Sequence, residues 1–143
     1  MSAISAPLLH GDEALSELQR VLMPTLQQLL DGVAGVYDHV PEDTSPPYVT
    51  WGAAWSAERD TLNGTADRVW FQLDVWSDYR GYREGNQIAG QIVRRLSHAV
   101  LVLDGFAPVH ILREQSRAGR DPDGRHRRIA LTFYSPYVSS TGG

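Results

Sequence analysis

The sequence holds few residues whose types and spacing suggest catalysis or metal binding. Asp121 and Asp123 precede Gly124, as in the first half of a calcium-binding loop. A third oxygen ligand before the glycine and a closing glutamate are both missing from this segment. The Asp-Pro-Asp-Gly run is also typical of a tight turn, because Pro and Gly suit turn geometry and Asp bonds to nearby backbone. We therefore predict a turn here.

The five histidines are scattered, and none forms a metal-binding pair. They are His10, His39, His98, His110 and His126. No two lie one helical turn apart, and there is no HExxH motif. His126 lies among arginines, which suits either a phosphate-binding patch or a charged strand edge that discourages aggregation. The sequence has no cysteine, which excludes disulfides, thiol nucleophiles and Cys-ligated zinc. We predict no metal and no cofactor.

Common enzyme motifs are also missing. There is no GxSxG or P-loop, and Gly81, Gly85 and Gly90 lack the spacing of a dinucleotide-binding loop. We predict that the protein is not an enzyme. The alternative is a small α+β enzyme or ligand-binding domain with a pocket of converging polar groups around Asp74 or Glu114.

Composition predicts a single soluble domain. The chain has 143 residues and a net charge of −4, with its arginines gathered between Arg113 and Arg128, so whole-molecule charge disfavours nucleic-acid binding. No run approaches the roughly 18 apolar residues of a membrane span, and the N-terminus lacks a basic start, so we expect no membrane association. We expect a flexible segment at 1–11, a domain at 12–134 and a loose tail at 135–143.

Apolar periodicity predicts two helices. The first covers Asp12–Leu22, with Leu15, Leu18, Val21 and Leu22 on one stripe. Pro24 should kink this helix or begin a second short one at 25–30, and Asp31-Gly32 should end it. The second helix should cover 82–99, with an apolar stripe that continues to Val100.

Strand-like segments complete the predicted fold. They are 36–38, 48–55, 66–76, 109–114 and 127–134. The order is helix, three strands, helix and two strands. This predicts an α+β fold with a mostly antiparallel sheet of four to five strands and two main helices packed on it.

The tryptophans suggest a second important face of the sheet. Asn63-Gly64 predicts a tight hairpin turn within a long exposed tip from Ser56 to Thr65. Alternation makes Val69, Phe71, Leu73 and Val75 the core face of the second hairpin strand, whereas Trp70, Gln72, Asp74 and Trp76 face the other way. A two-residue turn at Asn63-Gly64 would place Trp51 opposite Trp76 and Trp55 opposite Gln72, with all four tryptophans on that second face.

The tryptophan face has two interpretations. The first helix could cover it as a second core layer, or it could be a protein interface, since aromatic residues flanked by polar groups are typical of interfaces. The candidate subunit or ring–ring interface residues are Trp51, Trp55, Trp70, Gln72, Asp74, Trp76, Leu62, Asn63, Arg125, Arg127, Tyr134 and Tyr137.

Several short segments, in order, resemble a known family. They are Val-Tyr-Asp-His-Val-Pro at 36–41, Pro-Pro-Tyr-Val at 46–49, Leu-Asp-Val-Trp-Ser at 73–77, Ile-Ala at 88–89 with Leu96, Leu-Asp-Gly at 103–105, and Asp-Pro-Asp-Gly at 121–124 with Arg127. Together they resemble the tail-terminator or tail-completion proteins of long-tailed bacteriophages, which also occur in prophages and gene-transfer particles. The resemblance runs from about Asp12 to Tyr134.

The resemblance implies a virion structural protein without catalytic residues. Such a subunit forms a ring, usually hexameric, at the head-proximal end of the tail tube, and its partners are other copies of itself, the major tail tube protein and the head–tail connector protein. DNA passes through the lumen without specific binding, and assembly takes place in the host cytoplasm. The alternatives in the same particle are another neck or connector protein and a tail-tube subunit.

Overall fold

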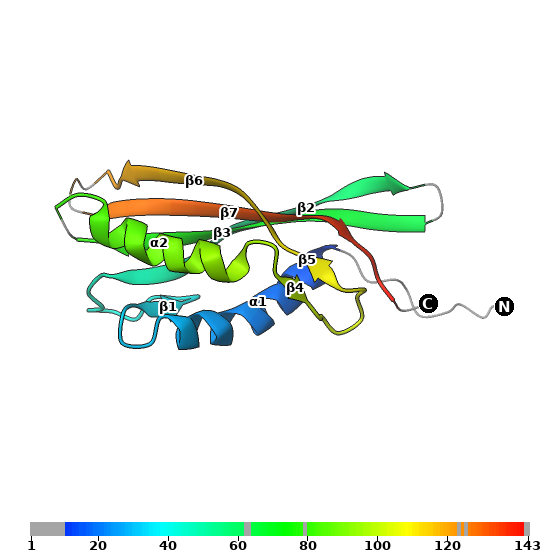
Figure 1. Cartoon of the computed structure of the whole chain (residues 1–143), viewed down its shortest axis with the longest axis horizontal. Coiled ribbons are helices and arrows are strands. Elements are labelled where there is room, and N and C mark those ends of the chain that lie inside the picture. The colour runs from blue at the N-terminus through cyan, green and yellow to red at the C-terminus, as the bar shows by residue number, and fades with distance from the viewer. Residues whose placement is uncertain (1–10, 62–63, 79, 123, 125, 142–143) are drawn as a thin grey trace.

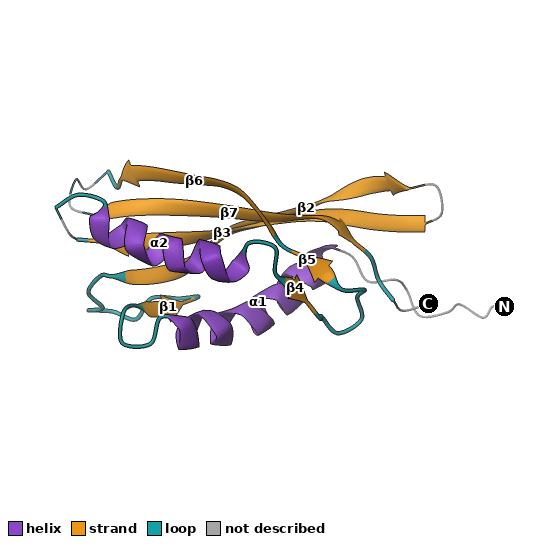
Figure 2. Cartoon of the chain, in the orientation of Figure 1, coloured by secondary structure: helices purple, strands orange, loops and turns teal. Residues whose placement is uncertain are grey.

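The computed structural model describes residues 11–61, 64–78, 80–122, 124 and 126–141. Within these ranges the chain forms a five-stranded sheet, a separate two-stranded ribbon and two helices (Figures 1 and 2). The elements are α1 (Gly11–Leu29), β1 (Gly35–Tyr37), β2 (Tyr48–Thr61), β3 (Gly64–Ser77), α2 (Arg83–Leu96), β4 (Val100–Leu101), β5 (Val109–His110), β6 (Leu112–Arg120) and β7 (Arg127–Val138).

The main sheet has the strand order β1-β2-β3-β7-β6. Strand β1 pairs with β2 in parallel, and the other neighbours pair antiparallel. The predicted α+β fold and the predicted order of elements are both confirmed. In the described ranges, neither helix is both long and apolar enough to cross a lipid bilayer.

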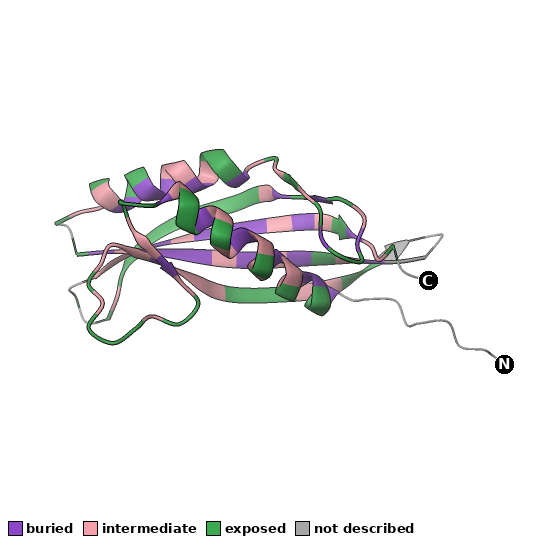
Figure 3. Ribbon diagram, turned by 90° about the horizontal axis from the view of Figure 1, so that it is seen from below, coloured by how far each residue is buried: buried purple, intermediate pink, exposed green. Residues whose placement is uncertain are grey.

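Both helices pack on one face of the sheet, and the core lies between them and that face (Figures 1 and 3). The predicted core residues of β3, Val69, Phe71, Leu73 and Val75, are all 0% exposed. Helix α2 contributes buried apolar residues one turn apart, as its sequence pattern predicts. It ends at Leu96, however, and Val100 lies in β4 with half of its surface exposed.

Helix α1 runs continuously past Pro24 to Leu29, so a second short helix is not formed. Pro24 is exposed, whereas Leu22 and Leu26 on either side of it are buried. Because the buried stripe recurs every four residues on both sides of the proline, burial favours a single helix despite the lost backbone hydrogen bond. The turn predicted at Asp31-Gly32 follows, and Gly32 has a φ of 76°.

The start of α1 is fastened to the β2–β3 hairpin. The backbone N–H of Gly11 donates to Oδ2 of Asp67 at 2.6 Å, and the Ser56 hydroxyl donates to Oδ1 of Asp12 at 2.7 Å. A Cβ on Gly11 would lie 2.7 Å from Cβ of Ser56, so only glycine permits this close approach. Asp67 therefore satisfies a free N–H at the helix N-terminus from a distant strand.

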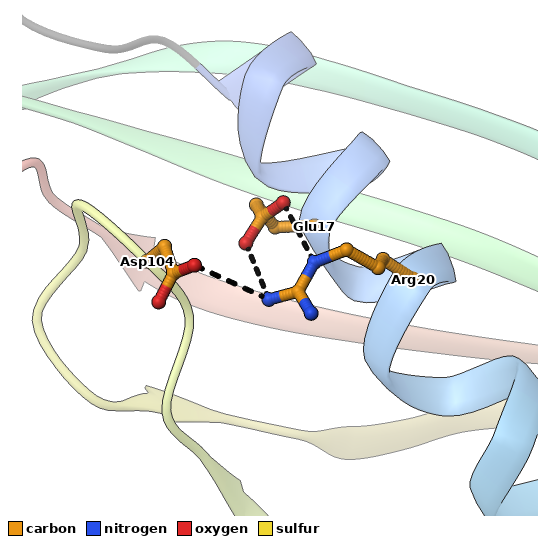
Figure 4. Close-up of polar contacts among 3 residues, drawn as sticks. All are labelled: Glu17, Arg20 and Asp104. Carbon is orange, nitrogen blue, oxygen red and sulfur yellow. Dashed lines mark hydrogen bonds and ion pairs between the residues drawn. The ribbon is translucent and has the colours of Figure 1, made fainter.

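The exposed side of α1 reaches the loop before β5 through Arg20 (Figure 4). Its guanidinium donates to Glu17 from Nη2 at 2.8 Å and from Nε at 3.0 Å, and it reaches Asp104 at 3.5 Å. The hydrogen bonds from Arg20 lower the pKa of the Glu17 carboxyl below its ordinary value. Glu17 raises the pKa of Arg20 in turn.

The β2–β3 hairpin differs from its predicted register. Thr61 pairs with Gly64, so the two loop positions are Leu62 and Asn63, which lie outside the described residues. Within the long tip predicted from Ser56 to Thr65 the strands continue past their predicted ends, because they pair up to Thr61 and from Gly64. In Figure 1 the ends of these strands extend beyond the body formed by the helices.

The end of the chain also differs from its prediction. Strand β7 continues to Val138, which is buried, and Ala107 then donates its N–H to the carbonyl of Ser139 at 2.9 Å. Thr141 donates to the Gly105 carbonyl at 2.9 Å. The stretch 135–141 is therefore bound to the body and is not a loose tail. The turn predicted before β7 is confirmed in its described part, where Gly124 donates to the carbonyl of Asp121.

Candidate functional site

The face of the main sheet opposite the helices carries most of the candidate residues. Because α1 and α2 both lie on the other side, the interpretation of this face as a core layer covered by the first helix is wrong (Figures 1 and 3). We call this surface the open sheet face and define it by Trp55, Trp70, Gln72, Asp74, Trp76, Arg128, Ala130 and Thr132.

Two stacked indoles form one end of the open sheet face. Trp55 and Trp70 are direct cross-strand partners, with ring centroids 5.7 Å apart and planes 9° from parallel. The guanidinium of Arg68 lies 5.7 Å from the Trp70 ring centroid, and the Trp70 indole N–H donates to Glu114 at 3.3 Å. Trp55 remains 43% exposed. A flat, half-exposed aromatic pair with polar neighbours has the character of a protein-binding hot spot.

A charged network forms the centre of the open sheet face. Arg128 donates from Nε to Oδ1 of Asp74 at 3.1 Å, and the Gln72 amide donates to the same oxygen at 2.9 Å. The Arg128 guanidinium also lies 5.7 Å from the Trp76 ring centroid. Asp74 is buried, so its charge is held by these donors. Sequence reasoning missed this network because it depends on the register between β3 and β7.

Trp51 does not share this face. A bulge between Trp51 and Ala54 shifts the register, so Trp51 lies opposite Leu73 and stacks on Phe71 at 5.1 Å. One extra residue in a strand moves the side chains that follow to the other face. Gly52 permits the bulge, because a Cβ there would lie 2.7 Å from Oδ2 of Asp74. The prediction that all four tryptophans share one face is therefore wrong.

One of the remaining candidate residues, Tyr134, adjoins the open sheet face, and the others are dispersed. Arg127 lies over the Tyr82 ring, 5.7 Å from its centroid, near the start of α2. Tyr134 pairs with Trp70 across β3 and β7. Tyr137 is half exposed, with the Arg59 guanidinium 5.9 Å from its ring centroid. Leu62, Asn63 and Arg125 lie outside the described residues.

A shallow hollow of about 290 Å³ lies between the centre of the open sheet face and β6. Its polar lining comes from Gln72, Gln115, Arg117, Arg120, Arg128 and Thr132. These amide, guanidinium and hydroxyl groups are suited to binding carboxylates or backbone carbonyls. Asp74 and Glu114, the carboxylates around which a pocket was considered, are held by Arg128 and Trp70 respectively. No cluster of three metal-ligating side chains occurs among the described residues.

The fold and the open sheet face define a small α+β protein with a surface suited to binding other proteins. The sequence model of tail completion protein gp17 matches residues 16–135. The chain belongs to this tail completion family, and it is accordingly a phage-tail structural protein.

Two solved structures are similar to this chain. A chain of the virion of a native gene transfer agent particle is 27% identical, with a TM-score of 0.69 over 80% of this chain and 84% of that one. A second solved structure shares the fold at 12% identity, with a TM-score of 0.58 over 94% of this chain and 99% of that one. Among curated proteins, no match to this sequence is found.

Proposed function

We propose that this protein is a tail terminator, which forms a hexameric ring that caps the head-proximal end of the tail tube and joins it to the head connector. The observation that carries the proposal is the match to the tail completion family over residues 16–135. The similarity to a chain of a gene transfer agent virion supports the same context.

The mechanism we propose is geometric. One side of the ring reproduces the surface that a tube subunit offers to the next tube subunit, and the other side does not, so tube growth ends where the ring is added. A closed ring requires head-to-tail contacts between identical subunits, in which two different patches of each subunit meet. No bond is made or broken, and the protein acts as a binding partner rather than a catalyst.

The open sheet face supplies a contact surface for a neighbouring subunit or an adjacent ring. Its support is the exposed Trp55–Trp70 stack beside the polar network of Asp74 and Arg128, a combination enriched at protein interfaces. The β2–β3 hairpin extends past the helices (Figure 1), and the indole stack lies just inward of that extension, since Ser56, next to Trp55, contacts the start of α1. Leu62, Asn63, Arg125, Arg127, Tyr134 and Tyr137 remain candidate contacts of the same interface.

We further propose that DNA passes through the ring without specific binding. The net charge of −4 favours this, since acidic groups along a lumen repel phosphate and prevent the DNA from adhering. Replacing exposed acids by lysine should increase DNA retention by assembled rings. Unchanged retention would contradict this part of the proposal.

Co-assembly with purified tail tube protein tests the main proposal. The protein should form closed rings, visible by negative-stain microscopy and by light-scattering mass, and it should shorten or cap growing tubes. A tube subunit would instead lengthen the tubes, and a connector protein would leave their length unchanged. A protein that stays monomeric and ignores tube protein contradicts the proposal.

A matched pair of variants tests the open sheet face. Trp55→Ala should abolish tube capping or ring formation while the protein stays folded, because the indole is exposed and its removal leaves the core intact. Val102→Ala, which shortens another exposed apolar side chain, between β4 and β5 and outside the open sheet face, is the control and should cap tubes normally.

A further inference from the structure

The two edges of the main sheet carry opposite charge. Strand β6 forms one edge and holds three arginines, Arg113, Arg117 and Arg120, against one acid, Glu114, and we call it the basic edge. Strand β1 forms the other, and its surrounding segment, 31–43, holds Asp31, Asp38, Glu42 and Asp43, which we call the acidic edge. The chain has no lysine or arginine between Arg20 and Arg59. The strand order places the two edges on opposite sides of the molecule (Figure 1).

The basic edge is open to a partner. Eight of the nine residues of β6 are exposed, and among the described residues its outer side has no neighbouring strand. Within the same residues, Arg113, Arg117 and Arg120 form no ion pair. A long edge strand with free backbone groups is a template for pairing with another chain, and its charge selects which chain can approach.

The acidic edge is open as well, and it is hollowed. All four acids of this edge are exposed. A hollow of about 500 Å³ between the end of α1 and β1 is lined by Asp31, Val33 and Tyr37, among others, and Val33 is 46% exposed. An apolar surface beside a carboxylate suits an arginine, because its methylene stem packs on the apolar group while its guanidinium binds the acid.

We propose that the occupant of the acidic edge is a second copy of this chain, docked by its basic edge. This inference rests on the proposed ring and names the contact that closes it. Charge complementarity supports a second copy, since both halves of the matching pair are present on one chain at opposite edges. Such a head-to-tail contact uses two different patches and repeats around a closed ring.

The same charges disfavour the pairing of two copies through like edges. Two basic edges repel, and so do two acidic edges, which disfavours a symmetric dimer through β6 and leaves the head-to-tail contact. Because these charges are exposed, their attraction is screened by salt within about 10 Å at 0.1 M ionic strength. Ring formation should therefore weaken as salt rises.

Charge-reversal variants test the proposal. Variant A carries Arg117→Glu and Arg120→Glu, so both of its edges are acidic. Variant B carries Asp31→Arg, Asp38→Arg and Glu42→Arg, which leaves Asp43 as the only acid of the former acidic edge, so both of its edges are basic. Each alone should need at least a roughly tenfold higher concentration to form rings, as measured by light scattering, because like charges then face each other at every contact. An equimolar mixture should form rings of alternating subunits near the wild-type concentration.

Two further variants complete the design. A chain that combines the substitutions of variants A and B has its edge charges exchanged and should form rings by itself. Arg95→Glu reverses one exposed charge on α2, outside the residues of both edges, and should assemble like the wild type. Circular dichroism reports whether each variant is folded.

The outcomes separate the two proposals. If wild-type rings form and variants A and B assemble as well as the wild type, or if the mixture and the combined variant do not recover, the edge contact is wrong and the ring stands. If the wild type forms no ring, alone or with tube protein, the proposed function fails and the edge contact fails with it.

Discussion

Arg128 on β7 holds the buried carboxylate of Asp74 on β3, with its Nε atom 3.1 Å from Oδ1. The side chain of Asp74 is 9% exposed, whereas that of Arg128 is 42% exposed. The arginine therefore lies at the surface and supplies a charge to a group that has little contact with water. This pair, together with the Gln72 amide, ties the two central strands together on the open sheet face.

Replacing this arginine should destabilise the fold. Arg128→Met leaves Asp74 with the Gln72 amide as its side-chain donor, and an under-satisfied buried acceptor costs about 1 to 3 kcal/mol. Urea denaturation measures the loss. Arg117→Met, on exposed β6, is the control and should change stability by less than about 0.5 kcal/mol. Equal stabilities of the two variants would show that the pair contributes nothing.

A side chain at the bulge of β2 should also be costly. In Gly52→Ala the new Cβ would lie 2.7 Å from Oδ2 of Asp74 and 3.2 Å from the Gln72 carbonyl oxygen. Because one of these atoms is backbone, relief requires a strand shift, and we expect a loss of about 1 to 3 kcal/mol. Gly119→Ala, whose Cβ would meet no atom within 4 Å, is the matched control. Thermal unfolding of both variants measures the two losses of stability. A loss in Gly52→Ala no larger than that in Gly119→Ala would refute the explanation.

The contact between Asp67 and the start of α1 should behave as a helix cap. Asp67→Ala removes the acceptor for the Gly11 N–H and should cost about 1 kcal/mol of the free energy of unfolding. Asp67→Asn keeps a side-chain oxygen acceptor and should retain most of that stability. Chemical denaturation of the three proteins measures the difference. An alanine variant as stable as the asparagine variant would exclude a capping role.

The ion pair on α1 predicts a pH dependence. Arg20 lowers the pKa of Glu17 from 4.5 in the folded protein, so the pair stabilises the fold above that value, and its contribution is lost as pH falls through the lowered pKa. Glu17→Gln should therefore be slightly less stable than the wild type at pH 7, and the difference should vanish in acid. Denaturation midpoints over a pH series measure this. A difference that persists or grows in acid would contradict the assignment.

Periodicity predicted most of the fold because it depends on local pattern. The alternation in β3 identifies its buried face, and the apolar spacing of α2 identifies its packed side. The register of β2 was not predictable, because the bulge depends on how closely Gly52 approaches Asp74 on another strand. The Ser- and Gly-rich end suggested a loose tail, yet Val138 is buried and Thr141 is bound to Gly105.

The candidate surface was predicted only in part, because it too depends on the register between strands. Trp70 and Trp76 were assigned correctly from alternation within a single strand. Trp51 was not, since its face is set by the bulge. The role of Arg128 depends on pairing between strands more than fifty residues apart, which a local pattern does not contain.

Two helices on the same side of a sheet leave a slab with unlike front and back (Figure 3). No internal symmetry makes these two sides of the molecule equivalent, so a binding partner can distinguish one side from the other. A subunit of this shape gives a direction to whatever it is built into, before any particular neighbour is specified.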